Sequence, residues 1–555
     1  MQFPNIYSLF RAQAAKYRDK PVFYTRSGTG WESQTWRQFE DQVHDLACAL
    51  AANGLTRGSS VAILAGNIPE WSVCDIATIA AGGVGVGIYP TSSAEQCEYV
   101  INHSDAEFVF VDSRAQLEKV LAGECPKVKE IVMLERREDA LPGASVSALD
   151  GLLEFGRRNR AEFLPRVEEI GFNAEPDDIA IMVYTSGTTG QPKGAMLSHR
   201  YILNSIESLR RSVPTQESDI AISYLPGCHV AERISGIYNR LYNGVPAYFI
   251  NDLSKLYEYM LDIKPTVFAS LPRFFEKIHA KIIGENGTDK ITSQIVREAF
   301  GGSVRLLTSG GAPLPLEIVD FFAKYDLPIL QAYGLTENIC VAFNTVAEHK
   351  FGTVGKAMPM CEVMIADDGE ILVKSEMMFS GYFKAPEKTA EMFDAAGWLK
   401  TGDLGELDRD GFLKITGRKK EIIVLSSGKN VAPALVENFV KESHLVSHCF
   451  LFGDGRSYCV ALVTVNEAEA AGYLNSIHLD PIGPTCLAQN KHVHAAITRI
   501  VANANSRISS SEQIKNFVIL DDDFSPLRDE ITPTMKLKRS VVAKNYSDVL
   551  EKLYE

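Results

Sequence analysis

The chain has 555 residues, 46% of them hydrophobic and 23% charged, with a formal net charge of −14. Such a length exceeds what one compact core usually holds, so about three or four domains or subdomains are expected. The acidic balance argues against a nucleic-acid-binding protein, because such proteins usually present a basic face. Ten cysteines, none in a CxxC pair or a zinc-type cluster with histidine, favour reduced thiols and a cytoplasmic protein.

Strand-like and helical patterns alternate through roughly the first 420 residues, which predicts layered α/β structure. The N-terminus is expected to form an amphipathic helix rather than a signal peptide, because Arg11 and Lys16 interrupt its apolar residues. The buried face of that helix is expected to consist of Ile6, Leu9, Phe10, Ala14 and Tyr17. Strands are predicted at 60–64, 107–111 and 304–307. The apolar stretch 73–89 contains Asp75 and four glycines, so helix, turn and strand are expected there rather than a membrane span.

The most informative motif is the glycine- and hydroxyl-rich run 184–194, which follows a buried strand predicted at 179–184. Glycines let backbone N–H groups approach an anion closely, hydroxyls add donors or a metal ligand, and Lys193 supplies positive charge. Pro192 and Gly194 stand where the common NTPase loop GxxxxGK[ST] needs its second glycine and its hydroxyl. The run therefore predicts a phosphate-binding loop of another type.

A helix is predicted after this loop. Ser198 is a suitable N-cap, and Ile202, Ile206 and Leu209 recur at helical spacing. Strand, glycine-rich loop and helix would then follow one another in the order that is typical of a phosphate site.

The run 184–194 resembles the phosphate-loop signature of the acyl-adenylate-forming enzymes, which include acyl-CoA synthetases, firefly-luciferase-like enzymes and peptide-synthetase adenylation domains. The resemblance implies an α/β fold: a large N-terminal domain of layered α/β subdomains with a β-barrel-like subdomain, and a small, mobile α+β C-terminal domain. It also implies ATP, Mg²⁺ and CoA as ligands. By this match Lys193 is catalytic and Thr188 is a metal ligand. The loop residues expected to bind the nucleotide are Thr185, Ser186, Gly187, Thr188, Thr189 and Gly190.

Two further segments, 309–313 and 331–337, match the same family in the expected order. The resemblance implies that Tyr333 stacks on adenine, Thr336 contacts the α-phosphate and Glu337 helps to hold Mg²⁺. A carboxylate beside a triphosphate is repulsive unless a divalent cation lies between them, which agrees with the role of Glu337. The other nucleotide-binding residues implied by these segments are Gly311, Ala312, Pro313, Gln331, Ala332, Gly334 and Leu335.

The match continues at Asp403 and Arg418, which it places at the ribose, and at Lys420, the hinge position. A carboxylate can accept hydrogen bonds from both ribose hydroxyls. The implied domains are 1–417 and 421–555, joined by a hinge at 418–420. In the smaller domain, apolar runs predict a hairpin at 449–465 and a long helix over 493–504.

Lys536, in the C-terminal segment 533–539, matches the lysine of the family's last motif and is predicted to be catalytic. Its ammonium can neutralise charge as the α-phosphorus becomes five-coordinate. The resemblance implies that the small domain then rotates about Lys420, removes Lys536 and brings a turn with Gly428 and Lys429 to the pantetheine channel.

Three segments, 225–233, 271–278 and 381–384, are similar to motifs of long-chain acyl-CoA synthetases. They favour a fatty acid and CoA over an amino acid, and His229 is expected to line the acyl site. Gly227 replaces the usual apolar residue of its motif. No tryptophan near 225–245 provides the gate that some relatives use.

The function expected from these motifs is that of an AMP-forming long-chain fatty acid–CoA ligase. Two alternatives stay open: a fatty acyl-AMP ligase that loads a carrier protein, and a non-catalytic nucleotide sensor of the same fold. Lys536, Glu337 and Lys193 together speak against the sensor, since binding alone would not require all three. The expected partners are small molecules, while peripheral membrane contact and a homodimer are left open.

Overall fold

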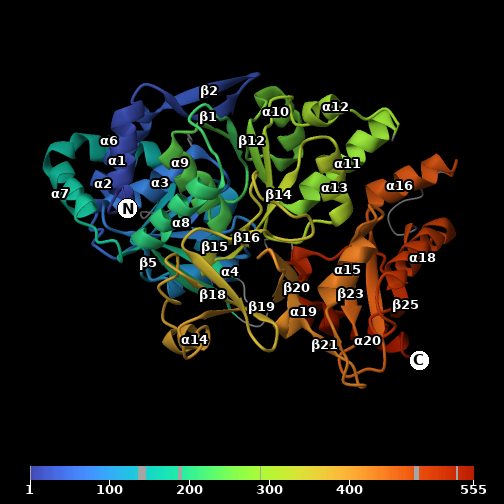
Figure 1. Ribbon diagram of the computed structural model, residues 1–555. Coiled ribbons are helices and arrows are strands. Elements are labelled where there is room, and N and C mark those ends of the chain that lie inside the picture. The colour runs from blue at the N-terminus through green and yellow to red at the C-terminus, as the bar shows by residue number, and fades with distance from the viewer. Residues whose placement is uncertain (1, 136–145, 186–190, 288, 480–486, 533–535) are drawn as a thin grey trace.

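We describe the protein from a computed structural model, which covers residues 2–135, 146–185, 191–287, 289–479, 487–532 and 536–555. A large part, coloured blue to yellow in Figure 1, contains two extended sheets with helices around them. A smaller part, coloured orange and red, gathers to one side and carries the C-terminus. This is the expected mixed α/β architecture, with a large N-terminal and a smaller C-terminal domain.

The first sheet has seven strands in the order β7-β6-β5-β3-β4-β8-β9. All neighbours are parallel except β8 and β9, which form an antiparallel pair. The strands are β3 (Ser60–Leu64), β4 (Val84–Ile88), β5 (Ala106–Val111), β6 (Glu130–Met133), β7 (Val146–Ala148), β8 (Ile179–Thr185) and β9 (Lys193–Ser198).

The second sheet has nine strands in the order β16-β15-β14-β13-β12-β10-β11-β1-β2. Its centre is parallel, and an antiparallel strand closes each end. The strands are β1 (Pro21–Ser27), β2 (Gly30–Thr35), β10 (Ala221–Ser223), β11 (Ala247–Phe249), β12 (Val267–Ser270), β13 (Leu306–Ser309), β14 (Ile329–Leu335), β15 (Asn338–Phe343) and β16 (Lys356–Ala357).

Helices form three layers around these two sheets. Alternate residues of β5 enter different cores: Phe108 and Phe110 pack with α1–α3 and α6–α8, whereas Val109 and Val111 pack with α4 and α5. The face of the second sheet that does not pack with α1–α3 packs on α10–α13. The helices are α1 (Ile6–Tyr17), α2 (Trp36–Ala52), α3 (Pro69–Ala80), α4 (Ala94–His103), α5 (Arg114–Leu121), α6 (Leu149–Arg158), α7 (Arg160–Phe172), α8 (His199–Ser212), the π-helix η1 (Ala231–Tyr238), α9 (Asn239–Asn243), η2 (Leu253–Lys255), α10 (Leu256–Ile263), α11 (Pro272–Asn286), α12 (Ser293–Glu298), α13 (Leu316–Lys324) and α14 (Pro386–Glu391).

A four-stranded antiparallel sheet, β17-β18-β19-β20, stands where the resemblance implies a barrel-like subdomain. Its strands are β17 (Cys361–Ile365), β18 (Glu370–Ser375), β19 (Leu399–Leu407) and β20 (Leu413–Arg418). The last strand leads into the short 3₁₀ turn η3 (Lys419–Glu421), where the chain leaves the large domain.

The small domain combines two sheets with helices. The strand β23 pairs antiparallel with β24, which confirms the predicted hairpin, and β25 adds a parallel edge. The elements are β21 (Ile423–Val424), β22 (Asn430–Val431), α15 (Pro433–Lys441), β23 (Val446–Phe452), β24 (Cys459–Val465), α16 (Glu467–Ser476), α18 (Lys491–Ser506), β25 (Ile514–Ile519), η4 (Pro526–Arg528), α19 (Arg539–Asn545) and α20 (Ser547–Lys552).

The apolar cores of the two domains are separate in the described part of the chain. The clusters of the large domain include no residue beyond Ile415, and those of the small domain begin at Ile423. Only the stretch around η3 lies between them. The chain can therefore change direction there without opening either core, as the hinge expected at 418–420 would require.

Several local predictions are confirmed. The five apolar residues of the N-terminal helix are all buried in α1, and Ser198 caps α8 by accepting a hydrogen bond from the amide of Tyr201. The stretch 73–89 forms the expected helix, turn and strand. No helix in the described residues is long and apolar enough to cross a membrane.

Two local predictions are wrong. The strand expected at 304–307 is β13, Leu306–Ser309, so it runs two residues further toward the glycine segment. The phosphate loop does not lead directly into a helix, because β9 intervenes. The helix begins at His199, about 20 Å further along an extended strand from Lys193, so its N-terminus does not abut the loop.

Candidate active site

The predicted ribose residues meet at the end of the four-stranded sheet. Asp403 on β19 lies directly opposite Arg418 on β20, and its side chain is buried. Arg418 Nε lies 2.9 Å from one carboxylate oxygen of Asp403, and the Tyr333 hydroxyl donates to the other across 2.6 Å. Burial and the charge of Asp403 raise the pKa of Tyr333, so its hydroxyl stays a donor. Because an ionised carboxylate offers about four acceptor positions, Asp403 retains capacity for a diol.

Lys536 of the small domain lies beside this cluster. Its side chain keeps accessible surface, yet protein atoms crowd its ammonium, and this partial burial together with Arg418 lowers the pKa of Lys536. Asp403 and Glu421 act in the opposite direction on the same pKa. The structure therefore brings the predicted catalytic lysine to the predicted ribose site.

His229 is also within electrostatic range of Lys536. Burial, and then the charge of Lys536, lower the pKa of His229 to about 4, so the imidazole is neutral at physiological pH. Its Nδ1 accepts a hydrogen bond of 3.2 Å from the amide of Ala231, at the start of η1. Lys536 is thus near both the Asp403 cluster and the 225–233 segment, the two places where nucleotide and acid are expected.

Tyr382 contacts both Glu337 and Lys193. The carboxylate of Glu337 is buried and accepts a hydrogen bond from the Tyr382 hydroxyl. Lys193 opens β9 opposite Thr185, and its Nζ lies 4.8 Å from the centre of the Tyr382 ring. The remaining loop residues, Ser186, Gly187, Thr188, Thr189 and Gly190, lie outside the described residues.

Tyr201 holds the turn that carries Thr336 and Glu337. The Tyr201 hydroxyl, on α8, donates to the Thr336 carbonyl at 2.9 Å and accepts from the Ile339 amide at 3.0 Å. The other predicted nucleotide residues lie at or just past the carboxyl ends of the paired regions of the adjacent parallel strands β13 and β14, where open α/β sheets bind ligands. Gln331, Ala332, Gly334 and Leu335 lie on β14, and Gly311, Ala312 and Pro313 lie exposed just after β13.

The 225–233 segment packs closely against the seven-stranded sheet. A Cβ atom on Gly227 would lie 2.8 Å from the ring of Trp71, and one on Gly87 of β4 would lie 2.5 Å from Cys228. This gives a reason for the departure at Gly227: Trp71, from α3, occupies the space that a side chain at this position would need. Trp71 is buried and stacks 4.9 Å beneath the guanidinium of Arg233.

The 271–278 segment lies where the two domains touch. It begins α11, and directly after it the ring of His279 lies 5.9 Å from that of His444 in the small domain. Burial and the neighbouring His444 lower the pKa of His279 to about 4. Burial raises the pKa of Glu276, whereas Lys441 of the small domain opposes this shift. This motif therefore contributes to the contact that holds the present domain orientation.

Three predicted residues lie away from this cluster. Lys420 is exposed in η3, and Gly428 and Lys429 form an exposed turn between β21 and β22. Gly428 has a φ of 77°, which favours glycine. The contacts of this turn in the described structure stay within the small domain, at Leu425 and Arg456.

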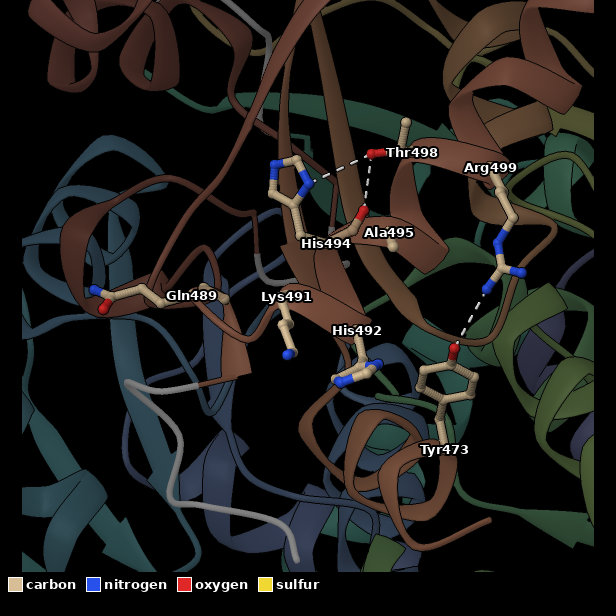
Figure 2. A pocket seen from close by; sticks show the side chains of 9 residues that line it. Tyr473, Gln489, Lys491, His492, His494, Ala495, Thr498 and Arg499 are labelled. Atoms are coloured by element: carbon tan, nitrogen blue, oxygen red, sulfur yellow. Dashed lines mark hydrogen bonds between the residues drawn. The ribbon is translucent and has the colours of Figure 1, made fainter. Parts of the chain in front are cut away.

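A separate pocket on the small domain is not part of this site. Figure 2 shows it along α18, where His492 and His494 point to it from neighbouring positions. Neither histidine belongs to a cluster of three or more metal-ligating side chains in the described residues. The pocket is lined by Tyr473, Ala488, Gln489, Lys491, His492, His494, Ala495, Thr498 and Arg499.

The residues present fit a magnesium ion. Mg²⁺ prefers oxygen ligands and is usually held by one or two carboxylates together with substrate phosphates. Glu337 supplies a buried carboxylate whose neighbour is a neutral hydroxyl rather than an ammonium, so its charge is available to a cation. Thr188, the second predicted ligand, lies outside the described residues.

The sequence analysis missed the roles of Tyr382, Trp71 and Tyr201. Tyr382 was noted only as part of a subgroup motif, and nothing in that motif indicates which side chain it contacts. Trp71 belongs to a helix far from any recognised motif, and Tyr201 lies in the helix predicted after the phosphate loop, where nothing indicated its contact with the turn at Thr336. The glycine at 227 was the available signal for Trp71, since a missing side chain in an apolar motif implies that another residue fills the space.

Comparison with known proteins gives the same family. The model of the AMP-binding enzymes matches residues 10–383, and that of their C-terminal domain matches residues 420–555. The long-chain-fatty-acid–CoA ligase FadD15 of Mycobacterium bovis is 34% identical over 97% of this chain and 95% of its own length. The long-chain-fatty-acid–CoA ligase ACSBG2 of Gallus gallus is 31% identical over 99% of this chain and 81% of its own.

Solved structures show the same fold. The A-PCP didomain of a carboxylic acid reductase from Segniliparus rugosus, in complex with AMP, superimposes with a TM-score of 0.83 at 22% identity. The match covers 100% of this chain and 82% of that one. Both domains, in the order that the motifs predict, are therefore accounted for, and the chain belongs to the AMP-binding, acyl-adenylate-forming family of enzymes.

Proposed function

We propose that this enzyme joins a long-chain fatty acid to AMP and then transfers the acyl group to the thiol of CoA. The observation that carries the proposal is that Lys536 lies near both the Asp403–Arg418 pair and His229. A cation there can act on both reacting anions. The chain length and the acceptor are inferred from the names of the most similar ligases and from the 225–233 motif.

In the first step a carboxylate oxygen of the acid attacks the α-phosphorus of ATP. The new P–O bond replaces the bond to pyrophosphate, which leaves with its electron pair. Two anions must meet, so the protein's main tasks are positioning and charge neutralisation. Lys193 would neutralise the leaving phosphates, Lys536 would neutralise the α-phosphate and the carboxylate, and Asp403 would hold the ribose. Mg²⁺, when bound through Glu337, would offset further phosphate charge.

Neutral His229 suits a place beside the acid. A carboxylate next to a protonated imidazole would be held by an ion pair, which would reduce its nucleophilicity. The low pKa of His229 avoids this, because the ring is uncharged near neutral pH. The close packing of Gly227 on Trp71 would give the acyl chain an apolar wall on this side.

In the second step the thiol of CoA attacks the acyl carbon of acyl-AMP, and AMP leaves. Lys536 is not needed for this attack and would obstruct the approach of the thiol. We propose that the small domain rotates about Lys420, which withdraws Lys536 and presents Gly428 and Lys429 to the pantetheine arm. The separation of the two apolar cores around η3 supports such a rotation.

The proposal is tested with short-, medium- and long-chain acids, ATP and Mg²⁺, measuring pyrophosphate release and thioester formation with CoA in parallel. Both products, formed fastest with long-chain acids, are expected. Pyrophosphate without CoA thioester, together with loading of a holo carrier protein, would favour the carrier-loading alternative. Binding of ATP without either product from any acid would indicate the nucleotide sensor and refute the ligase.

A further inference from the structure

We propose that Tyr382 is a positioning residue of the adenylation site, which keeps Glu337 and Lys193 apart and ready for a cation and a phosphate. The inference rests on the proposed function, since it takes Glu337 as a metal ligand and Lys193 as a phosphate ligand. The inference adds Tyr382, which contacts Glu337 through its hydroxyl and Lys193 through its ring.

The backbone of Tyr382 is firmly held beside the phosphate loop. Residues 380–383 run as an extra extended segment along β9: the Ser380 amide donates to Met196 at 2.8 Å, and the Phe383 amide donates to Gly194 at 2.8 Å. The amide of Tyr382 donates to Thr389 Oγ1 at 2.8 Å. The segment runs antiparallel to β9 and ends beside the start of that strand, where the loop ends, and its register determines where the Tyr382 ring points.

The Tyr382 side chain makes one contact to each charged group. Its hydroxyl donates to Glu337 Oε1, and its ring face lies 4.8 Å from Lys193 Nζ. The Tyr382 side chain is 5% exposed and Glu337 is buried, so the hydrogen bond between them is shielded from water, whereas Lys193 is only half-buried.

This arrangement avoids an unproductive ion pair. If Glu337 and Lys193 met directly in a buried place, a cation and a phosphate would have to break that pair before either could bind. A phenol satisfies the carboxylate with a neutral donor and the ammonium with an aromatic face. The buried carboxylate of Glu337 is thus oriented by a neutral partner and stays available to an incoming cation, while the half-buried ammonium of Lys193 faces an aromatic ring and stays available to a phosphate.

The same segment fixes the backbone of Glu337. The amide of Phe379 donates to the Glu337 carbonyl at 2.9 Å, and the Phe379 ring packs edge-on against Tyr382 at 5.0 Å. Glu337 is therefore held at main chain and side chain by residues three positions apart. Hydrogen-bond partners of metal-ligating carboxylates typically change metal affinity or activity about 10–100-fold when removed.

The test uses two substitutions that separate the two contacts. Tyr382→Phe retains the ring over Lys193 and removes the hydroxyl, whereas Tyr382→Leu removes both. Binding of Mn²⁺ in the presence of a non-hydrolysable ATP analogue is followed by the electron paramagnetic resonance signal of the free ion. We expect Tyr382→Phe to weaken Mn²⁺ binding about tenfold or more, with metal-free binding of the analogue unchanged. Tyr382→Leu should weaken both.

Tyr473→Phe, in the small-domain pocket, is the matched control and should leave both affinities unchanged. Thermal unfolding of each variant shows whether it is folded. A double-mutant cycle compares the effect of Tyr382→Phe in the wild type with its effect in the Glu337→Gln background. In that background the hydroxyl should no longer affect Mn²⁺ binding. An unchanged affinity in Tyr382→Phe, or an equal loss in both backgrounds, would overturn the inference.

Failure of the proposed function would look different. A wild-type protein that binds Mn²⁺ and the analogue but forms no pyrophosphate from any acid would refute the ligase, while the binding data still decide the role of Tyr382. A wild type that binds no Mn²⁺ with nucleotide would overturn both.

Discussion

The two sides of the candidate site are built differently. On the large domain, Asp403, Tyr333 and Glu337 are buried, and each is hydrogen-bonded to a side chain from another element. On the small domain, Lys536 lies on an exposed segment and is held through its backbone, which exchanges hydrogen bonds of 3.0 and 2.7 Å with Thr532. The groups of the large domain are thus fixed by side-chain hydrogen bonds, whereas Lys536 belongs to the small domain, which has an apolar core of its own.

This difference matches the timing of the proposed reaction. The nucleotide must stay bound through both steps, so its ligands belong in a framework that does not move. Lys536 is needed only while the phosphorus is attacked, so it can be carried by a domain that rotates away. If this interpretation is correct, substitutions on the large domain should impair both steps, whereas substitutions on the small domain should impair one.

The largest effect is expected for Lys536→Ala. Removal of a group that stabilises transition-state charge typically costs about 10²–10³ in rate, and pyrophosphate release should fall by that factor. The reaction of preformed acyl-AMP with CoA should be retained. Lys544→Ala, on an exposed face of α19, is the control for general effects on the small domain. Equal loss of both steps in Lys536→Ala would remove the distinction between the two sides.

Asp403→Asn should impair both steps alike. The substitution removes the charge that pairs with Arg418 and reduces what a ribose can bind. A hydrogen bond to a charged group contributes about 1.5–3 kcal/mol, so the KM for ATP should rise at least about tenfold. Asp408→Asn, in the exposed turn of the same hairpin, should have no effect. A defect confined to one half-reaction would contradict the proposed ribose role.

Lys420→Pro should impair the thioester step and spare pyrophosphate release. Proline fixes φ and removes the backbone donor, so the 3₁₀ turn could no longer change its dihedral angles. Stopped-flow measurement of each half-reaction separates the two steps. Lys420→Ala retains backbone freedom and should support both steps. Unimpaired thioester formation in the proline variant would refute a pivot at this position.

The smallest effect is a shift in the pH profile. The pKa of Lys536 is lowered, so its ammonium loses charge at a lower pH than an ordinary lysine, and adenylation should decline early on the alkaline side. The profile of kcat/KM for pyrophosphate release should therefore have an alkaline limb that Lys536→Arg moves to higher pH. The reaction of preformed acyl-AMP should lack this limb. Identical profiles for both reactions would contradict the assignment.

Local sequence patterns predicted several elements. The apolar run at 179–184 and the cap at Ser198 depend on neighbouring residues, and both predictions are confirmed. The intervening β9 was missed, because its residues Lys193–Ser198 form a strand only by pairing with β8. The contact of Tyr382 with Glu337, 45 positions away, could not be predicted, since no local pattern records which distant chain lies beside β9.

The amino-acid sequence alone, through its resemblance to the acyl-adenylate-forming enzymes, predicted the chemical groups and their order: a phosphate loop, an acidic residue for a cation, an acidic residue for a ribose and a late lysine. It could do so because motifs of this kind are short and each depends on local backbone geometry. The tertiary structure decided how these groups meet, with Lys536 beside Asp403 and the Tyr382 phenol between Glu337 and Lys193. Such encounters depend on sheet register and domain orientation, which arise from packing over the whole chain.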